Sequence, residues 1–354
     1  MKRLLLYSLA IFFYSVSFGQ GLSVSMLLEA SDIPQKKFNS YISKKGFAFT
    51  GNTFQTDTII AEYYYRGNRK RIRDSVIRAF KVFKTKLGIY YTYSTTSGDE
   101  YQYLKSSLKK EGFFCENEKD SLNAISLLFQ KNNFSATLSS NVIDSLTEFS
   151  FLVRKADLPK PKEIKYAEDL AAFDSHECLR YYFGERNVKK DIYYLSQNEI
   201  VKCSILFPNT NRQAVFLWGD AVNNCDLQYI YIGGQLRTET SMQYEKNVAE
   251  NIWRLKNGIH AGMSLYSLRK MNDAAFDFYG GNSVKMGMVL TDSTGKLNFK
   301  KENVILGCMN CDDRDFARQT IMNSDEAIMD KRILFVQTIV LNAAEIKQER
   351  QAAK

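Results

Sequence analysis

The sequence has few of the residues that break secondary structure and few of those that perform catalysis. Its 354 residues include 4 prolines, 19 glycines and 2 histidines. So little proline and glycine argues against long disordered segments. No P-loop, GxGxxG fingerprint or GxSxG nucleophile elbow occurs. The sequence therefore excludes the common phosphate-binding loops, dinucleotide fingerprints and α/β-hydrolase elbows.

Aromatic residues are abundant. The chain contains 24 phenylalanines and 21 tyrosines, and its hydrophobic content is 45%. Aromatic side chains favour strands over helices. Strand-like segments follow one another with occasional helices between them, without regular strand–helix alternation. The sequence predicts an α+β fold of tandem helix-plus-antiparallel-sheet modules.

The first residues have the three-part order of a secretory signal peptide. Lys2 and Arg3 precede an apolar stretch, and Ser17 and Gly19 place small residues before a cut at Gln20. The apolar stretch falls short of the ~20 residues of a membrane span, and no later run reaches that length. We expect a signal peptide at 1–19 and an exported protein, periplasmic, at the cell surface or secreted, with no transmembrane segment. The alternative is a retained N-terminal anchor.

The first half contains an internal repeat with an offset of 66 residues. Matched pairs include Phe38 with Leu104 and Gly46 with Gly112. Fixed spacing of this kind indicates duplicated units. Each unit is predicted to hold one helix and four strands, and the second unit would begin its strands at 113–117. The predicted organisation is a duplicated domain at 22–156, a linker at 157–165, a second α+β domain at 166–345 and a tail at 346–354.

The second half is predicted to start with a helix at 166–183. Its most distinctive segment places Gly262, Met263 and Ser264 before an amphipathic helix and a strand hairpin. This segment resembles small exported modules of the BamE lipoprotein and the β-lactamase inhibitor proteins, and the wider stretch 207–280 resembles uncharacterised exported Gram-negative proteins. The resemblance implies tandem helix-plus-sheet units that act by protein contacts without catalysis.

Six cysteines suggest disulfide bonds in an exported protein, although spacing does not fix their pairing. Five of them lie in the second half, and two of these form the single CxxC motif. The candidates for disulfides are Cys178, Cys203, Cys225, Cys308 and Cys311. Structural disulfides are favoured over a metal or redox role for the CxxC pair.

No complete catalytic set is visible. His176 and His260 lack the HExxH spacing that places two metal ligands on one helical face. Ser267 and Lys270 match SxxK, but the companion motifs of penicillin-recognising enzymes are missing. The acidic run around Asp313 lacks the EF-hand pattern. We assign no catalytic residue, metal or cofactor. The enzyme alternative is a hydrolase whose site is formed by Asp, Glu or Tyr residues scattered along the sequence.

A basic segment is the strongest candidate for ligand binding. Residues 36–110 hold 16 Lys or Arg and 5 Asp or Glu, a local charge of +11. Cations concentrated in one loop attract anionic polysaccharides. The alternative is an ordinary solvated loop. The polyanion-binding candidates are Arg66, Arg69, Lys70, Arg71, Arg73, Tyr63 and Tyr65.

The leading hypothesis from the sequence is a non-catalytic envelope or secreted protein. Its expected partner is an unknown envelope protein or an anionic polysaccharide, and no nucleic acid is expected because no binding motif accompanies the export signal. The alternatives are a polyanion- or glycan-binding protein that uses the basic first module, and a hydrolase with an unrecognised site.

Overall fold

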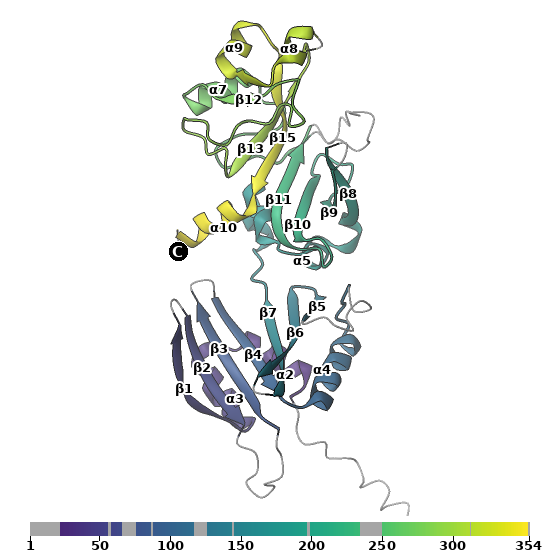
Figure 1. The fold of residues 1–354 in the computed structure, drawn as a ribbon, viewed down its shortest axis with the longest axis vertical. Coiled ribbons are helices and arrows are strands. Elements are labelled where there is room, and N and C mark those ends of the chain that lie inside the picture. The colour runs from purple at the N-terminus through teal and green to yellow at the C-terminus, as the bar shows by residue number, and fades with distance from the viewer. Residues whose placement is uncertain are drawn as a thin grey trace, which may run out of the picture. The chain divides into compact units, whose positions relative to one another are not determined.

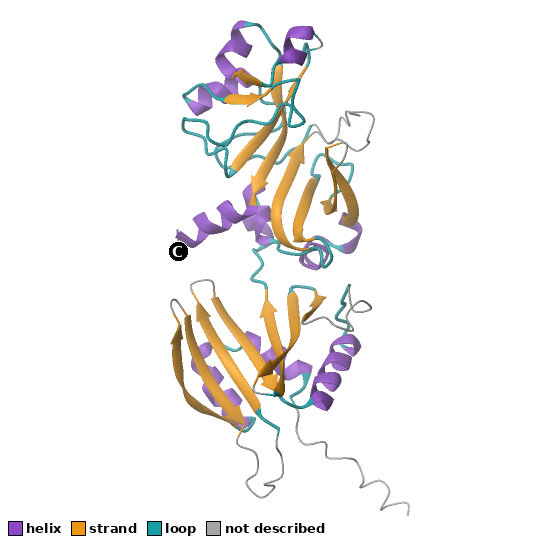
Figure 2. Ribbon diagram, in the orientation of Figure 1, coloured by secondary structure: helices purple, strands orange, loops and turns teal. Residues whose placement is uncertain are grey.

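The computed structural model describes residues 22–55, 58–65, 76–85, 88–116, 126–143, 145–196, 199–233, 250–311 and 313–352 (Figure 1). Helices and antiparallel sheets occur together, which confirms the predicted α+β fold (Figure 2). The chain divides into two compact units. Unit 1 comprises Met1–Phe129 and Ser135–Lys155, and unit 2 comprises Gln130–Phe134 and Ala156–Lys354.

Unit 1 is built on one antiparallel seven-stranded sheet with the order β1-β2-β3-β4-β7-β6-β5. Residues that lie opposite each other on neighbouring strands, such as Phe80 and Tyr93, point to the same side of this sheet. The strand bounds are β1 Phe47–Gln55, β2 Thr58–Tyr65, β3 Arg78–Thr85, β4 Gly88–Thr95, β5 Ser126–Lys131, β6 Phe134–Ile143 and β7 Leu146–Lys155.

Three helices of unit 1 begin and end at recognisable signals: α2 Val24–Asp32, α3 Gln35–Lys44 and α4 Gly98–Lys110. Ser23 and Ser97 cap α2 and α4 by accepting hydrogen bonds from backbone N–H groups of the first turn. Gly46 and Gly112 follow α3 and α4 with φ of +91° and +83°, a conformation that favours glycine. The sequence analysis did not predict α2.

The segments of the two predicted units form two meanders of one sheet. The two meanders β1–β4 and β5–β7 meet through their last strands, because β4 pairs with β7. The strands therefore follow in mirrored order from this central pair. Matched positions have matched environments, since Phe38 and Leu104 are 1% and 0% exposed, and Tyr63 and Phe129 are 4% and 0% exposed. The strand predicted at 113–117 is wrong, because the described part of this segment contributes only a single bridge at Phe114.

Unit 2 contains a six-stranded antiparallel sheet with the order β13-β15-β11-β10-β9-β8, and a small sheet of β12 and β14. The strand bounds are β8 Val188–Ser196, β9 Glu199–Leu206, β10 Ala214–Asp220, β11 Cys225–Gly233, β12 Asp277–Tyr279, β13 Glu302–Cys308, β14 Ile321–Asn323 and β15 Leu334–Asn342.

Short helices surround this sheet (Figure 1): η2 Pro161–Glu163, η3 Ala167–Ala172, α5 His176–Phe183, η4 Glu185–Asn187, α7 Leu265–Asn272, α8 Arg314–Arg318, α9 Ser324–Met329 and α10 Ala343–Ala352. The predicted continuous helix at 166–183 is wrong. Phe173 leaves helical geometry with ψ of 110°, and Ser175 starts a new helix by capping the N–H of Cys178. The predicted linker 157–165 contains η2.

Side chains of unit 2 are buried on both faces of the large sheet. One face packs Phe216, Ile230 and Ile339 into the main core, whereas the other packs Cys203, Ile205 and Val215 into a smaller cluster. Alternate residues of one strand thus belong to different cores. Both tryptophans, Trp218 and Trp253, lie in the main core. Among the described residues, no helix combines the length and apolar character needed to cross a bilayer.

Candidate functional site

The five cations of the basic candidate site, Arg66, Arg69, Lys70, Arg71 and Arg73, lie outside the described residues. Tyr63 and Tyr65 are described, and both face the helices. The Tyr63 ring packs against Phe38 at 5.6 Å between centroids, and its hydroxyl donates to Asn39. Tyr65 packs on Phe47. Both rings are therefore used within unit 1.

The three helices of unit 1 all pack on the face of the sheet that carries these tyrosines. On α3, Phe38 contacts Phe80 as well as Tyr63. On α4, Tyr101 stacks on Phe149 at 4.6 Å. Helix α2 packs beside β4 and β7. In Figure 1, α3 lies behind the strands β1–β4, and α2 lies near β4 and β7.

Within unit 1, the opposite face of the sheet, here called the open face, has no described helix packed on it. Its side chains follow from the strand register, because residues directly opposite each other in antiparallel strands point to the same side. Three rows run across the strands: Ile60, Phe83 and Tyr90; then Glu62, Lys81, Thr92 and Leu152; then Tyr64, Ala79, Ser94 and Ser150.

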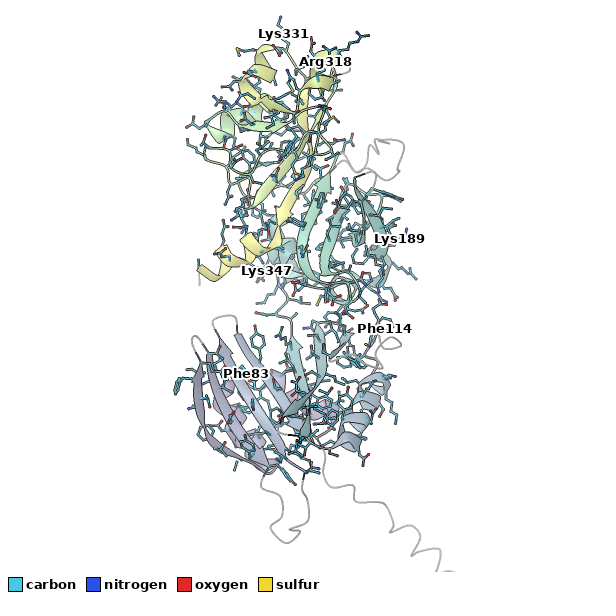
Figure 3. The ribbon with its side chains drawn as sticks, in the orientation of Figure 1. Phe83, Phe114, Lys189, Arg318, Lys331 and Lys347 are labelled. Atoms are coloured by element: carbon cyan, nitrogen blue, oxygen red, sulfur yellow. A yellow bond between two sulfur atoms is a disulfide. The ribbon has the colours of Figure 1, made fainter. Side chains whose placement is uncertain are left out.

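Large aromatic side chains of the open face are accessible. Tyr64 is 38% exposed, and Phe83, Tyr90 and Leu152 are half-buried. Figure 3 labels Phe83 on these strands. Arg154 lies over the ring of Tyr90 at 4.6 Å, a cation–π contact. Ile60, Ala79 and Ser94 of the same rows are buried, so the accessible apolar area of this face comes from the four larger side chains.

Charges of both signs lie among these aromatic residues. Lys81 forms an ion pair with Glu62 across β2 and β3 at 3.6 Å. Their side chains are 35% and 27% exposed, so this pair is partly withdrawn from water. A carboxylate in the middle row opposes binding of a polyanion and suits a surface with both donors and acceptors. This face was not predicted from the sequence, although the alternation of side-chain direction along β2–β4 is a sequence signal for it.

The cysteines do not form the predicted framework. Cys308 and Cys311 of the CxxC motif are joined as a disulfide. Cys178, Cys203 and Cys225 are thiols, so these disulfide candidates were wrong. The reason is their placement, since Cys178 belongs to the main core and Cys203 to the cluster on the other face of the sheet. Burial raises the pKa of Cys178 to about 11, which leaves an unreactive thiol.

The CxxC loop is held by contacts other than its disulfide. The Asn310 side chain accepts a hydrogen bond from the N–H of Ile333 at 2.7 Å and donates to the carbonyl of Lys331. Arg332 donates to the carbonyl of Asn310 and pairs with Asp313, the residue that caps α8. Asp313 is thereby engaged in an ion pair, and Asp312 lies outside the described residues.

The two histidines are separate and have different surroundings. His176 is 4% exposed, and its Nδ1 lies 2.9 Å from the Oγ of Ser204, which also accepts a hydrogen bond from the Trp218 indole. Ser204 is fully buried, so this serine–histidine pair is closed to a substrate. His260 is partly exposed and forms a hydrogen bond with its neighbour Ala261. In the described segments, no three His, Cys, Asp or Glu side chains meet in a group that could hold a metal ion.

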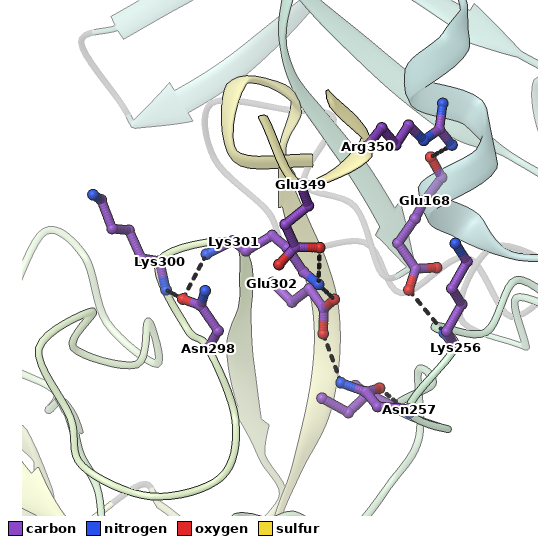
Figure 4. A network of polar contacts seen from close by, with 10 residues as sticks. Glu168, Lys256, Asn257, Asn298, Lys300, Lys301, Glu302, Glu349 and Arg350 are labelled. Carbon is purple, nitrogen blue, oxygen red and sulfur yellow. Dashed lines mark hydrogen bonds and ion pairs between the residues drawn. The ribbon is translucent and has the colours of Figure 1, made fainter. Parts of the chain in front are cut away.

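Two buried carboxylates in unit 2 hold the tip of a tight hairpin, in which Arg254 and His260 form an antiparallel bridge (Figure 4). Glu168 accepts a hydrogen bond from the N–H of Lys256 at 2.8 Å, and Glu302 accepts one from the Asn257 side chain at 2.6 Å. Glu168 and Glu302 are 3% and 5% exposed. Lys301 pairs with Glu302 at 2.6 Å. Both carboxylates therefore serve as internal supports for the hairpin.

One carboxylate oxygen of Glu168 is unpaired in this network. The Oε2 of Glu168 is buried and has no hydrogen-bond partner. Burial, with a smaller effect of Glu302, raises the pKa of Glu168, although the N–H of Lys256 acts in the opposite direction.

The Ser267 and Lys270 side chains of the SxxK motif are exposed on the first turns of α7. The N–H of Ser267 donates a hydrogen bond to Ser264, which caps this helix.

Comparisons with protein-family models, curated proteins and solved structures found no match.

Proposed function

We propose that this chain is a non-catalytic, exported binding protein and that the open face of unit 1 binds a protein partner. The observation that supports this most directly is the distribution of the helices. All three described helices of unit 1 cover one face of the sheet, while the other face keeps Tyr64, Phe83, Tyr90 and Leu152 accessible. Aromatic side chains and arginine are enriched in protein interfaces relative to other surfaces.

A protein partner fits the charges of this face better than a polyanion does. Lys81 and Glu62 already balance each other, and Arg154 is engaged with the ring of Tyr90. A polyanion would have to approach the Glu62 carboxylate, whereas a protein surface can offer donors and acceptors to both members of the pair. Binding energy would come mainly from burying the aromatic rings, with the ion pair fixing orientation.

Export is proposed from the N-terminal sequence, because residues 1–21 lie outside the described residues. We expect the mature chain to begin at Gln20. Mass spectrometry of the intact protein purified from its native cell envelope or culture medium tests this point. A chain that retains Lys2 and Arg3 would contradict cleavage.

Affinity purification of the tagged mature chain, read by quantitative mass spectrometry, tests the binding function. The key variants are Phe83→Ser and Leu152→Ser on the open face, and the matched control is Tyr103→Ser on α4, where the side chain is 55% exposed. The proposal requires one stoichiometric protein partner that the control retains and both open-face variants lose. Equal recovery with all four chains, or recovery of the chain alone, would contradict it.

A further inference from the structure

The two large sheets end in four edge strands, and three of these edges are protected. Free edges of a sheet offer unpaired N–H and C=O groups, and native proteins protect them with charge, short length or covering segments. Strand β8 carries Lys189, Lys190 and Asp191. Strand β5 has six residues and ends at Lys131. The N–H of Leu306 on β13 donates to the carbonyl of Gly287 at 2.8 Å.

Strand β1 is the exception among the described strands. Its nine residues, Phe47–Gln55, include no charged residue and no proline. A register shift between Phe49 and Gly51 divides the strand, and Gly51–Gln55 then pairs residue for residue with β2. Five regularly paired residues are enough for a strand of ordinary length.

The outer part of β1 is open to another chain. All residues from Asn52 to Gln55 are exposed, and the side chain of Phe54 is 74% exposed. A Cβ added at Gly51 would meet no atom within 4 Å, so a backbone can approach closely there. Phe54 lies opposite Ile59 on β2, which is 37% exposed, and the two form an apolar step beside the edge.

We infer that the outer edge of β1, along Gly51–Gln55, binds an extended segment of a partner protein as an added β-strand. In this mode the main-chain hydrogen bonds of the edge give affinity, and pockets for alternate side chains give selectivity. Phe54 and Ile59 supply the apolar contact for one such side chain. This site lies at the edge of the sheet and is independent of the open face.

The positive charge on α3 favours one class of ligand for the β1 edge over another. Lys37, Lys44 and Lys45 are exposed on α3, which packs on β1. Pairing β1 with β1 of a second copy would bring two such basic regions together, which is unfavourable. A foreign segment with acidic residues beside its strand would instead be attracted. The predicted ligand is therefore an extended peptide segment with acidic flanks.

A synthetic probe tests this inference without knowledge of the natural partner. The probe is a nine-residue fluorescent peptide of alternating valine and threonine with a glutamate at each end. Two controls accompany it: one has lysine at both ends, and the other has alternate backbone amides N-methylated so that it cannot pair as a strand. Fluorescence anisotropy measures binding to the mature chain.

We expect the acidic peptide to bind, and both control peptides to bind at least about tenfold more weakly. Phe54→Asp should weaken binding of the acidic peptide by about tenfold or more, whereas Val142→Asp on β6, where the side chain is 75% exposed, should leave it unchanged. Phe83→Ser should also leave it unchanged, which separates this site from the open face. Phe54→Ser provides a second, uncharged variant.

Several results would overturn the inference. Equal binding of the N-methylated peptide would show that strand pairing is not involved. Equal effects of Phe54→Asp and Val142→Asp would place the peptide elsewhere. Dimerisation of the chain in sedimentation experiments, lost in Phe54→Asp, together with no peptide binding, would assign the edge to a second copy.

Discussion

The carboxylate of Glu100 accepts a hydrogen bond of 2.8 Å from the hydroxyl of Tyr93 and so ties α4 to β4. The other oxygen of Glu100 accepts hydrogen bonds from Thr95 at 2.7 Å and from Arg78 at 3.0 Å. Glu100 is only 7% exposed. Since Glu100 lies on α4 and its partners lie on β3 and β4, this cluster holds the helix against the sheet of unit 1.

Removing this carboxylate should destabilise unit 1. Glu100→Ala removes the acceptor of three hydrogen bonds within unit 1, from Tyr93, Thr95 and Arg78, and we expect a loss of about 3 kcal/mol in the free energy of unfolding. The control, Asp99→Ala, removes an exposed carboxylate from the same first turn and should cost less than about 1 kcal/mol. Circular dichroism follows the whole chain, whereas fluorescence of Trp218 and Trp253 reports only unit 2. An equal loss in both variants would contradict the role of Glu100.

The stability of unit 2 should fall in acid because of His176. Burial, assisted by the positive charges of Lys190 and Arg180, lowers the pKa of His176 to about 4, from 6.5 in an unfolded chain. Between these two values the unfolded state binds more protons, so stability is complete above pH 6.5 and decreases as the pH falls towards 4. The expected loss is roughly 3 kcal/mol.

Urea unfolding followed by tryptophan fluorescence at pH 7 and pH 4.5 measures this effect. His176→Gln should flatten the pH dependence, whereas His260→Gln should keep it, because His260 is partly exposed and outside the buried cluster. The same slope in wild type and in His176→Gln would assign the acid sensitivity to other groups.

Glu168 should destabilise unit 2 at neutral and alkaline pH. Its pKa is raised, mainly by burial, so the folded state holds a proton more strongly than the unfolded state and stability falls as the pH rises through the folded pKa. Glu168→Gln keeps an acceptor for the N–H of Lys256 and removes the charge. We expect it to gain of order 1 kcal/mol over wild type at pH 8, and little at pH 4.

The matched variant Glu168→Ala should instead lose stability at both pH values, because the N–H of Lys256 then lacks its acceptor. Urea unfolding at pH 4 and pH 8 distinguishes the two substitutions. A glutamine variant that loses as much stability as the alanine variant would show that the charge of Glu168 is needed.

Reduction of the Cys308–Cys311 disulfide should leave unit 2 folded. The bond closes a ring of only four residues, for which chain entropy predicts about 2 kcal/mol. Asn310 and Arg332 hold the same loop by hydrogen bonds. Tryptophan fluorescence during urea unfolding, with and without a phosphine reductant, measures the change. Complete unfolding on reduction, or a second disulfide found by mass spectrometry after alkylation, would contradict the account.

The sequence predicted those elements whose signals are local. The stripe of Phe38 and Ile42 and the following Gly46 identified α3, because helical spacing and a left-handed C-cap are visible in a short window. The break at Phe173–Ser175 was missed, since apolar residues on both sides continue the same stripe. Six cysteines suggested several bonds, but Cys178 and Cys203 ended in different cores, which depends on how the strands pair.

The open face could not be predicted from the sequence, because it also depends on contacts between distant residues. Tyr63, Tyr64 and Tyr65 form one run in the sequence, and alternation says only that Tyr64 points away from the other two. Which side the helices cover is decided by contacts such as Phe38 with Tyr63, between residues far apart in the chain. The concentration of charge at 66–73 predicts ligand binding at that loop, whereas no local pattern in the sequence identifies the accessible aromatic face.

Site-specific photo-crosslinking in the native cells would show whether the open face contacts a protein partner. A photoreactive phenylalanine analogue would replace Phe83 or Tyr64 on the open face, and Tyr103 on α4 or Tyr181 on α5 as exposed controls. The account predicts that both open-face positions crosslink to the same protein and that the controls do not. Crosslinking at the control positions alone, or no protein crosslinked from Phe83 and Tyr64, would contradict it.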